Sequence, residues 1–178
     1  MAKAYLALGD GLKEDQLPWY ERGELAAERA LALKEGSADA HFYLAANRGK
    51  VVKLKPFWKV SPTIVADLEK HLLRAIELDP RHARALHMMG ILLDRTPGPL
   101  RLLLTGKKEQ VEDYLKRAVD ADAHSYAYIR WSLAEFYRDA GQLTKARAHA
   151  QALLGMSDPT DRRAWVETYR PAAEALLK

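Results

Sequence analysis

The feature that most constrains the fold is the short segment 133–146, which reads as a helix end, a tight turn and the start of a second helix. Large and small residues alternate there at helical spacing, so two helices can pack closely across the turn. These residues are Leu133, Ala134, Tyr137, Gly141 and Ala146. One such hairpin cannot bury its own apolar face and needs similar neighbours. The segment therefore predicts a repetitive helical protein.

A large residue followed by a small one recurs four times along the 178 residues, at Leu8-Gly9, Leu44-Ala45, Met89-Gly90 and Leu133-Ala134. The intervals are 36, 45 and 44 residues, longer than the ~34 of a plain helical-hairpin repeat. We therefore predict a single domain, 1–178, with units at about 2–36, 38–81, 82–122 and 124–158. Insertions are expected at about 48–59 and 96–107, and a capping helix at 160–178 that Pro171 kinks or splits.

The chain resembles the tetratricopeptide repeat (TPR) superfamily. Its pattern is matched by the residues of segment 133–146 and by Leu68, Leu72, Ala75, Pro80, Leu86, Met89, Gly90 and Leu93. The resemblance implies an all-α fold, a right-handed superhelical solenoid of about four TPR helical hairpins plus a C-terminal capping helix. Ala150, Leu153 and Pro159 depart from the pattern and leave the packing of the last hairpin open.

Segments 40–47 and 75–80 are similar to two narrower groups. One is the bacterial TPR proteins associated with tripartite (TRAP-type) solute transporters, and the other is the TPR regulators of microtubule dynamics. The bacterial group is typically exported and lipid-anchored. The sequence as written predicts a cytoplasmic protein, and a trimmed signal peptide would make it periplasmic or lipid-anchored.

The resemblance also implies that the first helices of successive hairpins line a concave groove. The groove positions in this sequence are Phe42, Tyr43, Asn47, Arg84, His87, Ile91, Tyr128, Trp131, Glu135 and Arg138. Exposed aromatic residues beside arginine and histidine suit a peptide, a helix or a protein surface. The alternative is that Phe42, Tyr43 and Trp131 pack against neighbouring helices. A lysine–asparagine arrangement that would hold a C-terminal carboxylate is not apparent.

Both insertions fall between the first and second helix of their units and are basic. Segment 48–59 holds five basic residues and segment 95–108 holds four, with no acid in either, whereas the whole chain has a net charge of only +4. The predicted basic edge comprises Arg48, Lys50, Lys53, Lys55, Lys59, Arg101, Lys107 and Lys108. It would dock a membrane surface or an acidic protein. Alternatively, the lysines are simply solvated, or Phe57, Trp58 and 102–104 mediate homo-oligomerisation.

Other functions find little support in the residues. The chain has no cysteine, and its six histidines form no pair with metal-site spacing. It contains neither a phosphate-binding glycine loop nor a nucleophile elbow. The single aromatic pair at 57–58 is not a nucleic-acid-binding series. We therefore expect a non-enzymatic protein without cofactor or metal that binds a protein or peptide and no nucleic acid.

Overall fold

The computed structural model describes residues 1–55, 61, 63–123 and 125–178, and within these ranges the regular elements are all helical. The hairpins pair α1 (Ala2–Gly11) with α2 (Leu17–Leu33), α3 (Ala38–Leu54) with α4 (Ile64–Leu78), α5 (Ala83–Arg95) with α7 (Val111–Ala121), and α8 (Ala127–Asp139) with α9 (Leu143–Leu154). The chain then continues through α10 (Arg162–Ala164), a π-helical turn (Trp165–Tyr169) and α11 (Arg170–Leu177).

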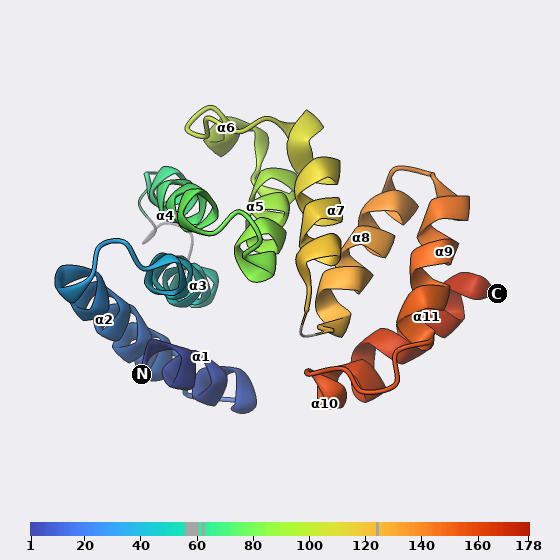
Figure 1. Cartoon of the computed structure of the whole chain (residues 1–178), viewed down its shortest axis with the longest axis horizontal. Coiled ribbons are helices and arrows are strands. Elements are labelled where there is room, and N and C mark those ends of the chain that lie inside the picture. Colours follow the sequence, from blue (N-terminus) through green and yellow to red (C-terminus); the bar gives the residue numbers. More distant parts are fainter. Residues whose placement is uncertain (56–60, 62, 124) are drawn as a thin grey trace.

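The hairpins follow one another along an arc that begins at α1 and α2 and ends at α11 (Figure 1). Consecutive first helices contact one another directly, as α1 with α3, α3 with α5 and α5 with α8. Such contacts are expected on the inner, tighter side of a curved stack of repeats. We refer to the surface of α3, α5 and α8 as the inner face. The predicted all-α superhelical solenoid of helical hairpins with a C-terminal cap is confirmed.

Local chemistry explains the turn at Gly141. Gly141 has a φ of +74°, a left-handed conformation that glycine adopts without steric cost. The Gly141 N–H donates to the carbonyl of Arg138 at 3.0 Å, and the Gln142 N–H donates to that of Tyr137 at 2.8 Å. This pair of bonds is the Schellman motif, which satisfies the last carbonyls of α8. The chain can then reverse into α9 within a few residues.

Small residues in the recurring pairs allow close packing between helices. A Cβ atom added at Gly90 would lie 2.8 Å from the Leu115 side chain, and one added at Gly9 would lie 2.5 Å from the Tyr20 ring. Leu115 and Tyr20 are themselves buried. A core of buried residues runs from α1 through to α9, and a second buried cluster joins α8 and α9 to the C-terminal segment.

In the first unit, helical spacing alone places Trp19, Ala26, Ala30 and Leu33 on one apolar face of α2, but this is not the face that is buried. Leu33 is 90% exposed, and the buried residues of α2 are Tyr20, Gly23 and Ala27. Leu8 of the first recurring pair is 50% exposed.

The structure gives the packing of the last hairpin, which the sequence leaves open, and shows where the cap is divided. Ala150 and Leu153, which depart from the repeat pattern, are both fully buried in the second cluster. The irregularity expected at Pro171 lies just before it, where the Arg170 N–H bonds to the Trp165 carbonyl across a π-helical turn. Proline lacks an N–H and its ring crowds the preceding turn, so a wider turn there relieves the conflict.

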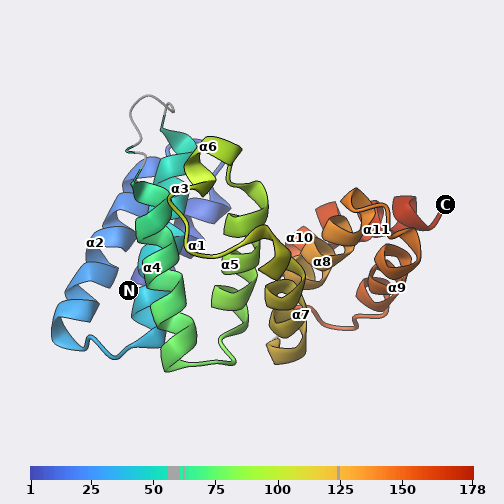
Figure 2. The same ribbon diagram turned by 90° about the horizontal axis from the view of Figure 1, so that it is seen from above.

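The two insertions take different forms. Residues 48–54 simply lengthen α3, while 56–60 and 62 lie outside the described residues, and with them the predictions for Phe57, Trp58 and Lys59. The second insertion forms α6 (Gly98–Arg101), a strap over 102–107 and a 3₁₀ turn at Lys108–Gln110. The end of α3 and α6 both lie along the upper side of Figure 2.

A buried carboxylate fixes the strap. Glu69 on α4 is only 3% exposed, and its two oxygens accept hydrogen bonds from the backbone N–H groups of Thr105 at 2.8 Å and Gly106 at 2.7 Å. A side chain at Gly106 would meet Leu93, at 2.8 Å, and Met89. The strap is therefore held close to both α4 and α5.

Candidate protein-binding surfaces

Aromatic rings surround Arg84 at the N-terminal end of α5. Its guanidinium carbon lies 4.7 Å from the ring centroid of Phe42, 4.9 Å from that of Tyr43 and 6.0 Å from that of Tyr126, within the range of cation–π attraction. One guanidinium nitrogen is 3.7 Å from Asp39 Oδ1, and the Arg84 side chain is 20% exposed. We call these five residues the Arg84 cluster. It joins α3, α5 and the start of α8.

Three predicted groove residues of α3 belong to the interior. Phe42, Tyr43 and Asn47 are all buried, so the expectation that the aromatic pair is exposed was wrong. The Asn47 amide donates to the Tyr43 carbonyl at 2.7 Å, one turn earlier in the helix. Burial raises the pKa of the Tyr43 hydroxyl, and the nearby Arg84 opposes that rise. Phe42 and Tyr43 lie beneath Arg84, which is the accessible group of the three, whereas Asn47 packs against Gly23 of α2.

Next along the inner face is a contact between α5 and α8. His87 Nε2 lies 2.8 Å from Ser132 Oγ, and its ring centroid is 4.9 Å from that of Tyr128. Burial, with a further contribution from Arg95, lowers the pKa of His87 to about 3. Its imidazole is therefore neutral near pH 7 and acts as a hydrogen-bonding spacer between helices. The predicted groove residue Ile91 is half-buried one turn further along α5.

Charged residues occupy the C-terminal ends of α5 and α8. Arg95 and Arg138 contact the same carboxylate, that of Glu135, at 3.5 and 3.7 Å. Arg138 also donates to Asp139 at 2.9 Å. Both arginines are well exposed. We call Arg95, Glu135 and Arg138 the charged triad, and it is a second accessible group on the inner face.

Trp131 is not part of an open surface. It is only 7% exposed and packs in the second buried cluster with Trp165 and Ala173 of the C-terminal segment. The cap therefore covers the side of α8 that carries this ring. Asp161, just before α10, further ties the cap to α8 by accepting from the N–H groups of Ala127 and Tyr128 at 2.7 and 3.1 Å.

Sequence reasoning missed several residues of this surface, namely Asp39, His82, Arg95, Tyr126 and Ser132. Asp39 carries a usable signal, because it precedes Phe42 by one helical turn and so faces the same side. It accepts from His82 Nε2 at 3.1 Å and thereby links the second and third hairpins. Tyr126 lies outside any helical pattern, at the N-cap of α8, so helical spacing could not place it.

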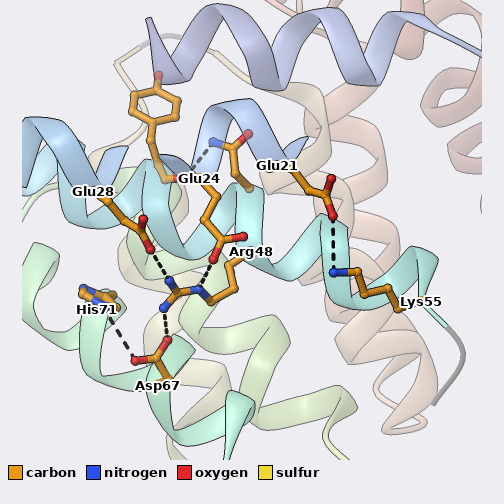
Figure 3. Close-up of polar contacts among 9 residues, drawn as sticks. Glu21, Glu24, Glu28, Arg48, Lys55, Asp67 and His71 are labelled. Carbon is orange, nitrogen blue, oxygen red and sulfur yellow. Dashed lines mark hydrogen bonds and ion pairs between the residues drawn. The ribbon is translucent and has the colours of Figure 1, made fainter. Parts of the chain in front are cut away.

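The predicted basic edge is largely neutralised within the protein. Arg48 on α3 contacts three carboxylates: Glu24 at 2.7 Å and Glu28 at 2.8 Å, both on α2, and Asp67 on α4 (Figure 3). Its side chain is 17% exposed. Arg48 therefore joins the second helix of unit one to both helices of unit two, which is a structural role.

Other members of the edge also have internal partners. Lys50 contacts Asp10 at 2.5 Å and Lys55 contacts Glu21 at 3.3 Å. Arg101 donates to the carbonyl of Thr96 at 2.8 Å. Lys53, Lys107 and Lys108 are exposed, and Lys59 lies outside the described residues. The positive edge predicted from the sequence is thus reduced, in the described chain, to three exposed lysines and Arg101, whose printed partners are backbone carbonyls.

The described residues include neither a metal-binding cluster nor a membrane-spanning helix. Across residues 1–55, 61, 63–123 and 125–178, no group of three or more histidine, aspartate or glutamate side chains could hold a metal ion. The helices in these ranges also include none that is long and apolar enough to cross a membrane.

No protein-family model and no curated protein matches the chain. Among solved structures, it is similar to the MamA protein at 16% identity, with a TM-score of 0.54 and coverage of 99% of this chain and 87% of that one. A weaker likeness is to a thermophilic TPR protein of Thermus thermophilus, at 21% identity over 99% of both chains with a TM-score of 0.47. Another is to Pseudomonas aeruginosa PilF, at 18% identity over 98% of this chain and 88% of that one, with a TM-score of 0.39.

The stacked hairpins and the likeness to MamA establish a solenoid fold of stacked helical hairpins, which is the fold that the TPR resemblance implies. The narrower similarities to transporter-associated and microtubule-regulating TPR proteins stay predictions.

Proposed function

We propose that this chain is a non-enzymatic interaction scaffold that binds a peptide, a helix or a protein surface on the inner face of α3, α5 and α8. The observation that carries the proposal is the Arg84 cluster. Its cation lies among aromatic rings, is partly open to solvent, and has only a loose 3.7 Å contact with Asp39. Arginine and aromatic residues are the side chains most enriched at the centres of protein interfaces.

The size of the surface fits a short structural element. Arg84 and Arg95 are eleven residues apart on α5, which corresponds to about 16 Å along a helix. The charged triad at one end and the Arg84 cluster at the other would anchor a partner of about that length. An extended segment of roughly five residues or three turns of helix spans this distance.

The proposal is tested by capture from native extract with immobilised protein. We compare wild type with Arg84→Ala and with the double charge reversal Arg95→Glu, Arg138→Glu. Lys116→Glu, an exposed position on the second helix α7, is the matched control. Both inner-face variants should lose the partner while the control keeps it, with unchanged helical circular dichroism in all four proteins. Equal recovery of the partner by every variant would refute the inner face as the binding surface.

Trp131→Ala and His87→Ala are unsuitable for this purpose. Both side chains contact the interior, so truncation would create cavities and confuse loss of binding with loss of packing. Arg84→Ala removes an accessible cation and leaves the aromatic rings in place.

A second function, as a transport-accessory or peripheral membrane protein, rests on the exposed Lys53, Lys107 and Lys108. Flotation with anionic liposomes at low salt tests it, with the triple glutamine variant as the comparison. Since Arg48, Lys50 and Lys55 are already paired with carboxylates, we favour the inner face. Self-assembly through the same edge would appear as a concentration-dependent mass in sedimentation.

A further inference from the structure

Two histidines face each other between the helices of the second hairpin. His41 Nδ1 on α3 lies 2.9 Å from His71 Nδ1 on α4, and the ring centroids are 5.2 Å apart. His41 Nε2 is 3.0 Å from the carbonyl oxygen of Glu35, and His71 Nε2 is 3.9 Å from Asp67 Oδ1. Neither ring belongs to the proposed binding surface.

The hydrogen-bond partners fix where the protons lie. A carbonyl oxygen only accepts, so His41 Nε2 carries a proton and donates it to Glu35. In a neutral His41, the Nδ1 atom is then unprotonated and can only accept a hydrogen bond. His71 Nδ1 must therefore carry the proton of the 2.9 Å contact. The two neutral rings are held in opposite tautomers.

A bridging metal ion does not fit this geometry. Tetrahedral zinc with nitrogen ligands at about 2.0–2.1 Å would hold two ligating nitrogens about 3.3 Å apart, whereas these two are separated by 2.9 Å. A shared proton matches the observed spacing.

We propose that the His41–His71 contact is an acid-sensitive latch between α3 and α4. A first added proton goes to His71 Nε2, beside the Asp67 carboxylate, and leaves the bond between the rings intact. A second added proton can go only to His41 Nδ1. Two N–H groups would then point at each other, and the rings must separate. Mild acid thus loosens the second hairpin next to Arg48.

Charged groups around the pair act in both directions, because the cations lower the pKa values of the two histidines and the acids raise them. The cations facing it are Arg48 on α3 and Lys70 and Arg74 on α4. The acids facing it are Glu35, after α2, and Asp67, which already contacts Arg48. Burial is the main reason that the pKa values of both histidines fall below the ordinary value.

The sign of the effect follows from these directions. Below about pH 6.5, the ordinary histidine pKa, the unfolded chain binds protons that the folded pair refuses. Stability is therefore complete above that pH and is lost as the pH falls. At pH 5.5, each histidine that stays neutral in the fold raises the unfolding constant by up to roughly tenfold.

The first test is nitrogen NMR of the full chain labelled in histidine. At pH 8, the latch requires the Nδ1-protonated tautomer for His71 and the Nε2-protonated tautomer for His41. On acidification the two rings should titrate together, in coupled steps. Two Nε2-protonated rings that titrate independently near pH 6.5 would overturn the proposal.

The second test removes the titration and keeps the hydrogen bond. In His71→Asn the amide can still donate to His41 Nδ1 but cannot become charged. His149→Asn on α9 is the matched control, because burial also lowers the pKa of His149 and this ring is remote from the latch. Between pH 7.5 and 5.5, His71→Asn should reduce the rise in the unfolding constant by up to roughly tenfold, the share of one histidine that stays neutral in the fold. His149→Asn should leave the coupled titration of His41 and His71 unchanged, whereas His71→Asn should leave His41 titrating alone. An unchanged rise in His71→Asn, or a His41 titration indifferent to that variant, would refute the latch.

Discussion

Replacing Glu69 tests how the second insertion is held against the solenoid. Its carboxylate accepts backbone N–H groups from Thr105 and Gly106 at 2.8 and 2.7 Å while only 3% exposed. Hydrogen bonds to a charged group contribute about 1.5–3 kcal/mol each. Water can reach part of this backbone once the side chain is removed, so Glu69→Ala should lower the free energy of unfolding by about 2–4 kcal/mol. Glu69→Gln keeps one acceptor and should lose about half as much.

Urea unfolding gives the stability change, and limited trypsin digestion reports on the strap itself. Arg101 and Lys108 flank the strap and Lys107 is its last residue, so a released strap should be cut at these positions. A loss of about 2 kcal/mol in local stability corresponds to roughly thirtyfold faster cleavage if opening is rapid and reversible. Glu77→Ala, an exposed position on the same helix, is the control. Unchanged cleavage and less than about 0.5 kcal/mol of destabilisation would refute this account of the strap.

Three further predictions concern packing, ion pairs and acid. Gly23→Ala should cost about 1–3 kcal/mol in urea unfolding, because the new Cβ would overlap the Asn47 side-chain oxygen; an unchanged midpoint contradicts it. Arg48→Met should cost about 2 kcal/mol more than the control Lys53→Met, since three carboxylates lose their shared cation; equal losses contradict it. From pH 6.5 down to 4, His87→Gln should show a shallower loss of stability than wild type, because the folded pKa of about 3 keeps His87 neutral; parallel curves contradict it.

The local features of the hairpins could be predicted from the sequence. The turn at Gly141 depends on residues within one or two helical turns, so spacing alone reveals it. The Met89-Gly90 pair is also visible in the sequence, although the Leu115 side chain that packs on Gly90 lies on α7. The order of the units, the absence of strand-forming patterns and the position of the cap follow from the same periodicity.

Features set by distant contacts could not be predicted in this way. The buried face of α2 depends on Gly23, where Asn47 of the next hairpin packs. Burial of Trp131 depends on the cap, which returns to cover α8. The charge of the basic edge was overestimated for a related reason. The prediction considered only the charges within each insertion, whereas Glu24 and Glu28, which pair with Arg48, lie on α2, 24 and 20 residues before it.

The accessible surface was also hard to predict because arginine and aromatic side chains serve both packing and binding. Phe42 and Tyr43 occupy the expected helix but point into the interior, and Arg84 covers them. Helical spacing identifies the face of a helix but not how deep that face lies beneath its neighbours.

Site-specific photo-cross-linking tests the central claim most directly. A photoreactive residue replaces Arg95 on the inner face or, as the comparison, Lys116 on α7, and each protein is irradiated in native extract. Binding on the inner face predicts a discrete adduct from position 95 that Arg84→Ala abolishes, and none from position 116. An adduct from position 116 alone, or one from position 95 that is indifferent to Arg84→Ala, would contradict the claim.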